Sequence, residues 1–208
     1  VSRGSLAYKI LCELLGKKDG VSLGKGGSMH MFDPSKNFWG GHGIVGAQVP
    51  IGTGIAFTFK YNESKSLSLT YFGDGAANQG QVYESYNIAA LWKLPVIFVI
   101  ENNKYGMGTS VNRSSAGDNL SDRGKAYGIV ADIVDGMDVI AVRDAALKAM
   151  DYCRSGKGPY ILEMKTYRYR GHSMSDPAKY RTRDEVDEIR QNSDPINNIK
   201  SILDKFGL

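Results

Sequence analysis

The chain has 208 residues, of which 42% are hydrophobic and 23% are charged, an ordinary balance for a globular protein with one sizeable core. Its net charge of +4 is too small to indicate a nucleic-acid partner, and no apolar run approaches the roughly 18 residues of a membrane-spanning helix. Cys12 and Cys153 are isolated in the sequence, so neither a zinc site nor a disulfide framework is expected.

The first 46 residues combine a short helical pattern with a glycine-rich stretch. Apolar residues recur at helical spacing over residues 5–15, which predicts an amphipathic helix. Residues 20–46 are rich in glycine and carry His30 and His42. Such a stretch is either a plain loop or a loop whose backbone approaches a ligand closely, and composition alone leaves both interpretations open.

The middle of the chain predicts a strand–helix–strand unit. A helix over residues 47–60 contains several small residues, so it is expected to pack tightly against its neighbours. Apolar runs at 67–72 and 96–100 predict two strands, and the pattern at 78–92 between them is helical. A crossover of this length places the two strands parallel in one sheet. The fold class is therefore α/β.

The C-terminal part alternates short predicted elements with one long irregular segment. Gly171 and Pro177 prevent regular structure over residues 167–183, and irregular segments of this length are often functional. No repeat or linker divides the chain, so a single domain over residues 1–208 is expected. The elements expected here are a loop with a short helix (109–125), strands (139–142 and 160–166) and helices (144–153, 184–191 and 195–206), the last of them capped by Asp194 ahead of Pro195.

Polar groups follow both strands of the central unit. Asp74 lies in the turn Gly73–Gly75 after the first strand, and Asn103 follows the second, with Tyr105 two residues further on. Parallel strands end at the same edge of a sheet, where α/β proteins bind ligands. A carboxylate, an amide oxygen and a backbone carbonyl are the hard oxygen donors that suit Mg²⁺ or Ca²⁺, and a helix that begins near Asn78 favours an anion there. These features predict a metal–diphosphate site.

Other nucleotide sites fit the sequence less well. No GxxxxGK[ST] motif is present, and the glycine spacing after Gly73 does not fit a dinucleotide-binding GxGxxG motif. The GDG turn and the Asn-Asn pair are each common when they occur alone, and only their combination within about thirty residues is specific.

GDG followed by NN resembles the thiamine diphosphate motif of thiamine-dependent enzymes. GDGAANQGQ, ENNKYGMGTSV, KGGSMHMF, GGHGIVGAQVP and KTYRYRGHSMSDPAKYRTR together resemble the alpha subunits of the E1 components of 2-oxo acid dehydrogenases, from about Leu11 to Pro195. GHSMSDP and YRTR are more similar to the pyruvate enzymes than to the branched-chain 2-oxo acid or acetoin enzymes. Those enzymes remain the alternative, together with a non-catalytic fragment of the fold.

The resemblance implies a three-layer thiamine diphosphate-binding fold with a mostly parallel sheet and helices on both faces. It also implies the cofactors thiamine diphosphate and Mg²⁺. The roles that it assigns are metal binding for Asp74, Asn103 and the carbonyl of Tyr105, approach to the diphosphate for Gly73, Gly75, Ala76 and His172, and backbone contacts to the aminopyrimidine for Gly43 and Val45. His172 is also the expected catalytic residue.

The resemblance further implies an oxidoreductase that decarboxylates pyruvate and transfers the acetyl unit to the lipoyl group of an E2 component, in the multienzyme complex that links glycolysis to acetyl-CoA. In this family a beta subunit supplies the glutamate that ionises the cofactor, so an α₂β₂ heterotetramer is expected. By comparison with the family, N- and C-terminal parts of the subunit are expected to lie outside these 208 residues, and the N-terminal part would supply a Tyr-Arg pair to the cofactor and a substrate-facing His.

The serine that is phosphorylated in eukaryotic relatives matches Ser173, where a phosphate would add negative charge beside the diphosphate. The second family serine is replaced by Lys179. This departure favours a bacterial, cytoplasmic protein over one of the mitochondrial matrix.

Overall fold

The computed structural model describes residues 1–207, which fall into two compact units divided between Gln48 and Val49. The first contains α1 (Ala7–Leu14) and a short 3₁₀ helix, η1 (Pro34–Lys36). The second contains all the remaining elements. The single-domain organisation expected from the sequence stays a prediction.

The glycine-rich loop of the first unit encloses a buried carboxylate. Glu13 of α1 is fully buried and accepts hydrogen bonds from the backbone N–H groups of Ser22 (2.7 Å), Gly24 (2.9 Å) and Gly26 (2.6 Å). Burial pushes the pKa of Glu13 upward, but these N–H groups lower the pKa overall. A Cβ atom on Gly20 would lie 2.3 Å from Glu13 Oε2, so only glycine fits there. Part of the glycine density therefore has a structural cause.

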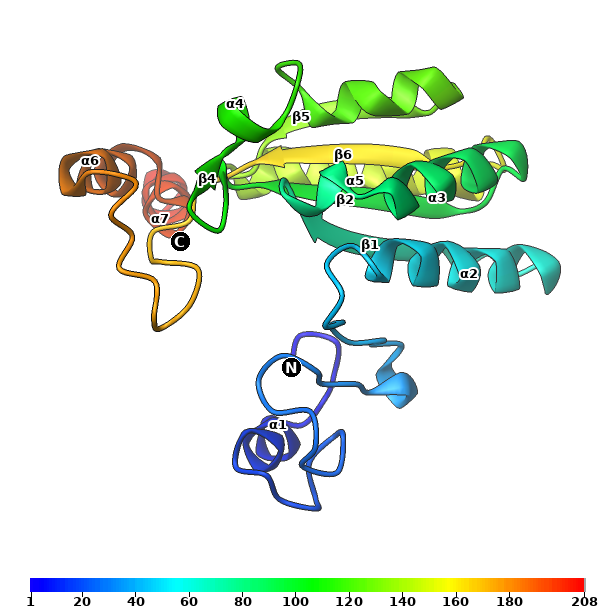
Figure 1. The fold of residues 1–208 in the computed structure, drawn as a ribbon, viewed down its shortest axis with the longest axis horizontal. Helices are drawn as coiled ribbons and strands as arrows, with labels where there is room; N and C mark the ends of the chain where they lie inside the picture. Colours follow the sequence, from blue (N-terminus) through cyan, green and yellow to red (C-terminus); the bar gives the residue numbers. More distant parts are fainter. Residues whose placement is uncertain (208) are drawn as a thin grey trace. The chain divides into compact units, whose positions relative to one another are not determined.

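The second unit is built on a four-stranded sheet. Its strands are β1 (Ser68–Gly73), β2 (Val96–Asn102), β5 (Val130–Asp135) and β6 (Tyr160–Lys165), all parallel, in the order β1-β2-β6-β5 (Figure 1). The predicted βαβ crossover is confirmed, with β1 and β2 as neighbours.

Helices cover both faces of this sheet. Val49 and Ala56 of α2 (Gln48–Tyr61) and Val82 and Tyr86 of α3 (Gly80–Leu91) share one core with Phe98 of β2. On the opposite face, Ala149 and Cys153 of α5 (Val139–Arg154) pack with Ile97 and Val99 of β2. The central strand is thus apolar on both sides, as expected for a buried parallel strand. The predicted three-layer α/β architecture is confirmed.

The remaining elements are mostly short and lie in the connections. Asp194 caps the last helix, as predicted, and Pro195 follows it in the first turn. The Asp194 carboxylate accepts hydrogen bonds from the N–H groups of Ile196 and Asn197. No helix within residues 1–207 is long and apolar enough to cross a membrane. The remaining elements of the second unit are η2 (Ala76–Asn78), β3 (Tyr105–Gly106), β4 (Thr109–Ser110), α4 (Val111–Ser114), η3 (Leu120–Tyr127), α6 (Arg183–Ser193) and α7 (Pro195–Lys205).

The strand predicted at residues 139–142 is wrong, because these residues form the first turn of α5. Asp138 caps that helix by accepting from the N–H groups of Ile140 and Ala141. The strand is instead β5, whose sequence VADIVD carries two aspartates and therefore lacks an apolar run. Asp132 is accommodated because Lys148 Nζ (2.8 Å) and the Tyr160 hydroxyl (2.7 Å) both donate to it.

Two glycines of α2 provide a matched test of its packing. A Cβ atom on Gly52 would lie 2.7 Å from Thr70 Cβ of β1, whereas one on Gly54 would meet nothing within 4 Å. We expect Gly52→Ala to lower the free energy of unfolding by about 1–3 kcal/mol through overpacking. Gly54→Ala should raise it by about 0.5–1 kcal/mol through helix propensity. Urea denaturation of both variants measures the difference, and equal effects would contradict the tight α2–β1 contact.

Candidate metal and diphosphate site

The ends of β1 and β2 bring the two predicted loops together. Gly73 pairs with Glu101 in the parallel register, so Asp74 lies beside the turn that follows Asn102. The backbone of Gly106 approaches so closely that a Cβ atom there would lie 3.2 Å from Gly75 Cα and 3.6 Å from Asp74 Oδ2. The carboxylate and the second loop therefore share one corner at the carboxyl ends of the strands.

Asp74 is only 2% exposed, and its Oδ2 atom has no hydrogen-bond partner among residues 1–207. Burial raises the pKa of this carboxyl, although its own N–H group, the charge of Arg168 and the N–H of Asn103 partly offset the shift. Buried carboxylate oxygens are normally satisfied, because an unsatisfied one is costly. A cation bound at Oδ2 would satisfy this atom.

The turn after β2 supplies further oxygen atoms. Asn103 Oδ1 accepts from the N–H of Tyr105 at 3.3 Å, and the Tyr105 carbonyl accepts from Arg168 Nη2 at 3.1 Å. A carbonyl oxygen has two lone pairs, so the one on Tyr105 keeps a position for a second partner. Within the described residues, no three His, Cys, Asp or Glu side chains cluster to hold a metal. A cation at Asp74 would therefore need amide, carbonyl, water or phosphate oxygens, which is the donor set that Mg²⁺ accepts.

The segment after β6 is tied to this turn by Arg168. Its Nη2 donates to the carbonyls of Tyr105 and Met107 (2.7 Å), and its Nη1 lies 3.2 Å from His172 Nδ1. The ring of Tyr180 packs on that of Tyr105 with centroids 5.0 Å apart. The sequence did not distinguish Arg168 from the other arginines of residues 168–183, because its role depends on a contact with a distant loop.

Asp176 organises the same segment from within. Its carboxylate accepts from the N–H groups of His172 (2.7 Å) and Ala178 (2.8 Å) and from the Tyr180 hydroxyl (2.9 Å). His172 itself is exposed, as is Ser173, whose hydroxyl lies 3.0 Å from that of Ser175. The contact of His172 with a diphosphate and the phosphorylation of Ser173 stay predictions.

The first helical residues after Asp74 differ slightly from the expected pattern. A 3₁₀ turn, η2, precedes α3, which begins at Gly80 with no side-chain cap. Asn78 instead donates to the Asp74 carbonyl (3.4 Å) and to Ser115 Oγ (3.1 Å). Of the residues predicted to approach the diphosphate, Gly75 is exposed and Ala76 is buried.

Gly43 and Val45 belong to the first unit, where both are exposed. A Cβ atom on Gly43 would lie 3.8 Å from the His30 ring, and His30 Nδ1 lies 3.1 Å from the Gly41 carbonyl. His30 thus has a structural contact within its own unit. The roles of Gly43 and Val45 toward a cofactor stay predictions.

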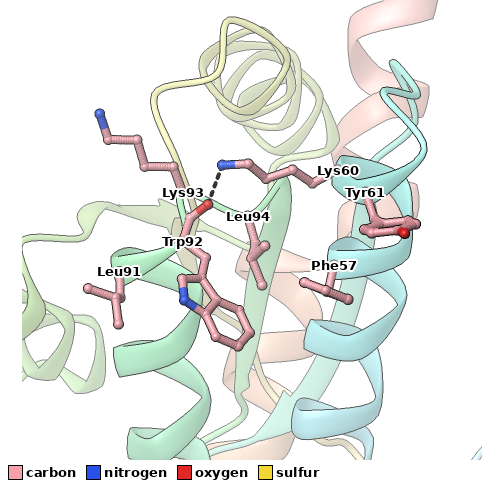
Figure 2. A pocket seen from close by; sticks show the side chains of 7 residues that line it. All are labelled: Phe57, Lys60, Tyr61, Leu91, Trp92, Lys93 and Leu94. Carbon is pink, nitrogen blue, oxygen red and sulfur yellow. Dashed lines mark hydrogen bonds between the residues drawn. The ribbon is translucent and has the colours of Figure 1, made fainter.

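A hollow of about 460 Å³ lies at the other end of the sheet, between the C-terminal ends of α2 and α3 (Figure 2). Lys60 reaches across it to donate to the Trp92 carbonyl, while the Lys93 side chain points away. It contains none of the predicted site residues, and its lining is Phe57, Lys60, Tyr61, Leu91, Trp92, Lys93 and Leu94.

The buried Asp74 and the half-buried Asp132 should respond in opposite directions to the loss of their charge. Asp74→Asn removes a carboxylate that the fold satisfies poorly, so we expect the apo protein to melt about 2–4 °C higher, which corresponds to about 1 kcal/mol. Asp132→Asn removes a carboxylate bonded to Lys148 and Tyr160, so it should cost about 1 kcal/mol, an amount limited by the partial exposure of the ion pair. Thermal unfolding without added metal measures both, and a loss of stability in Asp74→Asn would show that its carboxylate is structural.

Comparison with known proteins agrees with this geometry. The family model described as "Dehydrogenase E1 component" matches residues 1–208. The chain is 62% identical over 204 residues to a pyruvate dehydrogenase E1 component subunit alpha of Rhizobium meliloti, covering 98% of this chain and 59% of that protein. The relatives of the same name from Zymomonas mobilis (61%, covering 96% and 56%) and Homo sapiens (the somatic mitochondrial form, 58%, covering 96% and 50%) are similar. The chain thus spans between 50% and 59% of the length of these relatives, and it belongs to the dehydrogenase E1 component family.

Proposed function

We propose that this chain acts as part of the alpha subunit of a pyruvate dehydrogenase E1 component and binds the diphosphate end of thiamine diphosphate through Mg²⁺. The observation that carries the proposal is the buried Asp74 Oδ2 atom, which has no partner among residues 1–207 at the corner where the GDG and NN loops meet. The names of the relatives support pyruvate as the substrate of the complete subunit.

In this proposal each side of the corner has a separate task. Asp74, Asn103 and the Tyr105 carbonyl hold Mg²⁺ by their oxygen atoms. Gly73, Gly75 and Ala76 leave the backbone accessible to phosphate oxygens, and His172 adds a donor from the loop that Arg168 attaches to Tyr105. Gly43 and Val45 contact the aminopyrimidine through their backbones.

When bound, thiamine diphosphate supplies the electron sink that accepts the electron pair released as carbon dioxide leaves a 2-oxo acid. The residues of this chain contribute binding and orientation, since none of the described groups at the corner is placed as a general base. A beta subunit would supply that base, and the lipoyl group of an E2 component would receive the acetyl unit. Relatives from bacteria and from mitochondria both match the chain, and we propose the cytoplasm of a bacterium because Lys179 replaces the second family serine.

Calorimetric titration with Mg²⁺ and thiamine diphosphate, with and without a beta subunit, tests the site. We expect Asp74→Ala and Asn103→Ala to weaken binding at least about 100-fold, because each removes a proposed metal ligand. Asp122→Ala is the matched control, since its carboxylate forms an exposed pair with Lys125 at 2.9 Å and contacts none of the proposed metal ligands among residues 1–207. It should change affinity less than about twofold.

The absence of binding under both conditions, or binding that Asp74→Ala leaves intact, would favour a non-catalytic fragment. Turnover of pyruvate, a branched-chain 2-oxo acid and acetoin by the reconstituted complex then separates the substrate classes. Faster turnover of either of the latter two would overturn the assignment to pyruvate.

A further inference from the structure

A fully buried carboxylate, Glu163, lies on β6, next to the end of β2. Its Oε1 atom accepts from Asn102 Nδ2 at 2.7 Å and pairs with Lys165 Nζ at 2.6 Å, and its Oε2 atom accepts from the N–H of Ser121 at 2.8 Å. Burial pushes the pKa of Glu163 upward, but the bonds from Lys165, Asn102 and Ser121 lower the pKa below its usual value. Glu163 is therefore held as an anion, and both of its oxygens have partners.

The anion fixes the orientation of the Asn102 amide. An ionised carboxylate only accepts hydrogen bonds, so Asn102 must turn its NH₂ group toward Glu163. Its Oδ1 atom is then directed to the N–H of Lys104, at 3.2 Å. The Asn102 backbone is held as well, because its carbonyl accepts from the N–H of Thr166 at 2.9 Å. Asn102 is 4% exposed and is secured at three atoms.

The bond to Lys104 stabilises an unfavourable backbone conformation. Lys104 has a φ of 73°, in the left-handed region that is unfavourable for a residue with a side chain. The turn formed there sets where the chain goes next. Asn103 precedes Lys104 and Tyr105 follows it, and these two residues carry the proposed metal ligands of this loop.

We propose that Glu163 is a positioning residue that acts through Asn102 to set the turn presenting Asn103 and the Tyr105 carbonyl to the metal. This inference rests on the proposed function, because the cation that the turn would bind is the proposed Mg²⁺. It assigns no contact between Glu163 and the cation. The proposed role differs from simple core stability, because it predicts an effect on the turn and on cation affinity that a comparable loss of stability elsewhere would not produce.

The experiment compares Glu163→Gln, Asn102→Ala, the double variant and Asp132→Asn in the full chain with its beta subunit. Mn²⁺ is the probe, followed by its paramagnetic signal in the presence of thiamine diphosphate. We expect Glu163→Gln and Asn102→Ala each to weaken Mn²⁺ binding about 10–100-fold. The double variant should be no weaker than Asn102→Ala alone, since both act on one turn. Asp132→Asn loses stability on the adjacent strand and should keep wild-type affinity.

A second readout separates this inference from the proposed function. Amide hydrogen exchange at Lys104 should become at least about tenfold faster in Glu163→Gln and stay unchanged in Asp132→Asn. Glu163→Gln with unchanged Mn²⁺ affinity and unchanged Lys104 exchange would overturn the positioning role. If the wild-type protein binds no Mn²⁺, the proposed function fails, and the Lys104 exchange rates alone decide whether Glu163 sets the turn.

Discussion

The parallel pairing of β1 with β2 is the constraint on which the candidate site depends. Because Gly73 is in register with Glu101, the turn that contains Asp74 and the turn that contains Asn103 leave the sheet side by side. A slip of one residue would move every side chain of a strand to the opposite face. Buried and exposed residues alternate along β1, so a slip of β1 would expose Phe72 and bury Tyr71. The packing of the core therefore positions the polar corner.

Three carboxylates are buried among residues 1–207, and they differ in whether the fold supplies hydrogen-bond partners for both oxygen atoms. Glu13 is satisfied by three backbone N–H groups and Glu163 by Asn102, Lys165 and Ser121, and the pKa of each is lowered. Asp74 is the exception among them, with a raised pKa and an oxygen without a partner in residues 1–207. The fold thus provides partners where a carboxylate has a structural role. An unsatisfied group of this kind in a loop corner is typical of a binding site.

The sequence predicted the strands that consist of an unbroken apolar run. It missed a strand whose polar residues are stabilised by side chains distant in the sequence. The apolar run of β2 was sufficient to find it, whereas β5 was missed because Asp132 relies on Lys148 and Tyr160, which lie 16 and 28 residues away. The GDG and NN motifs predicted that the loops of Asp74 and Asn103 meet, because sequence order and the crossover rule bring strand ends together. Arg168 depends on loop conformation and gave no comparable signal. Glu163 could have been noticed in the sequence, because it is a lone carboxylate within the otherwise largely apolar strand YILEMK.

The two sides of the candidate site differ in how firmly they are held. Asp74 and the Asn102 turn follow strands of the sheet and are fixed by buried contacts, including the fully enclosed Glu163. His172 lies on a segment secured by exposed hydrogen bonds, one between its ring and Arg168 and one from its backbone N–H to the Asp176 carboxylate. Local opening requires less free energy where contacts are few and solvated. A ligand at this corner would therefore meet a preformed metal side, whereas the His172 side would gain order from the same ligand, since the Tyr105 carbonyl and His172 share Arg168 as a common partner.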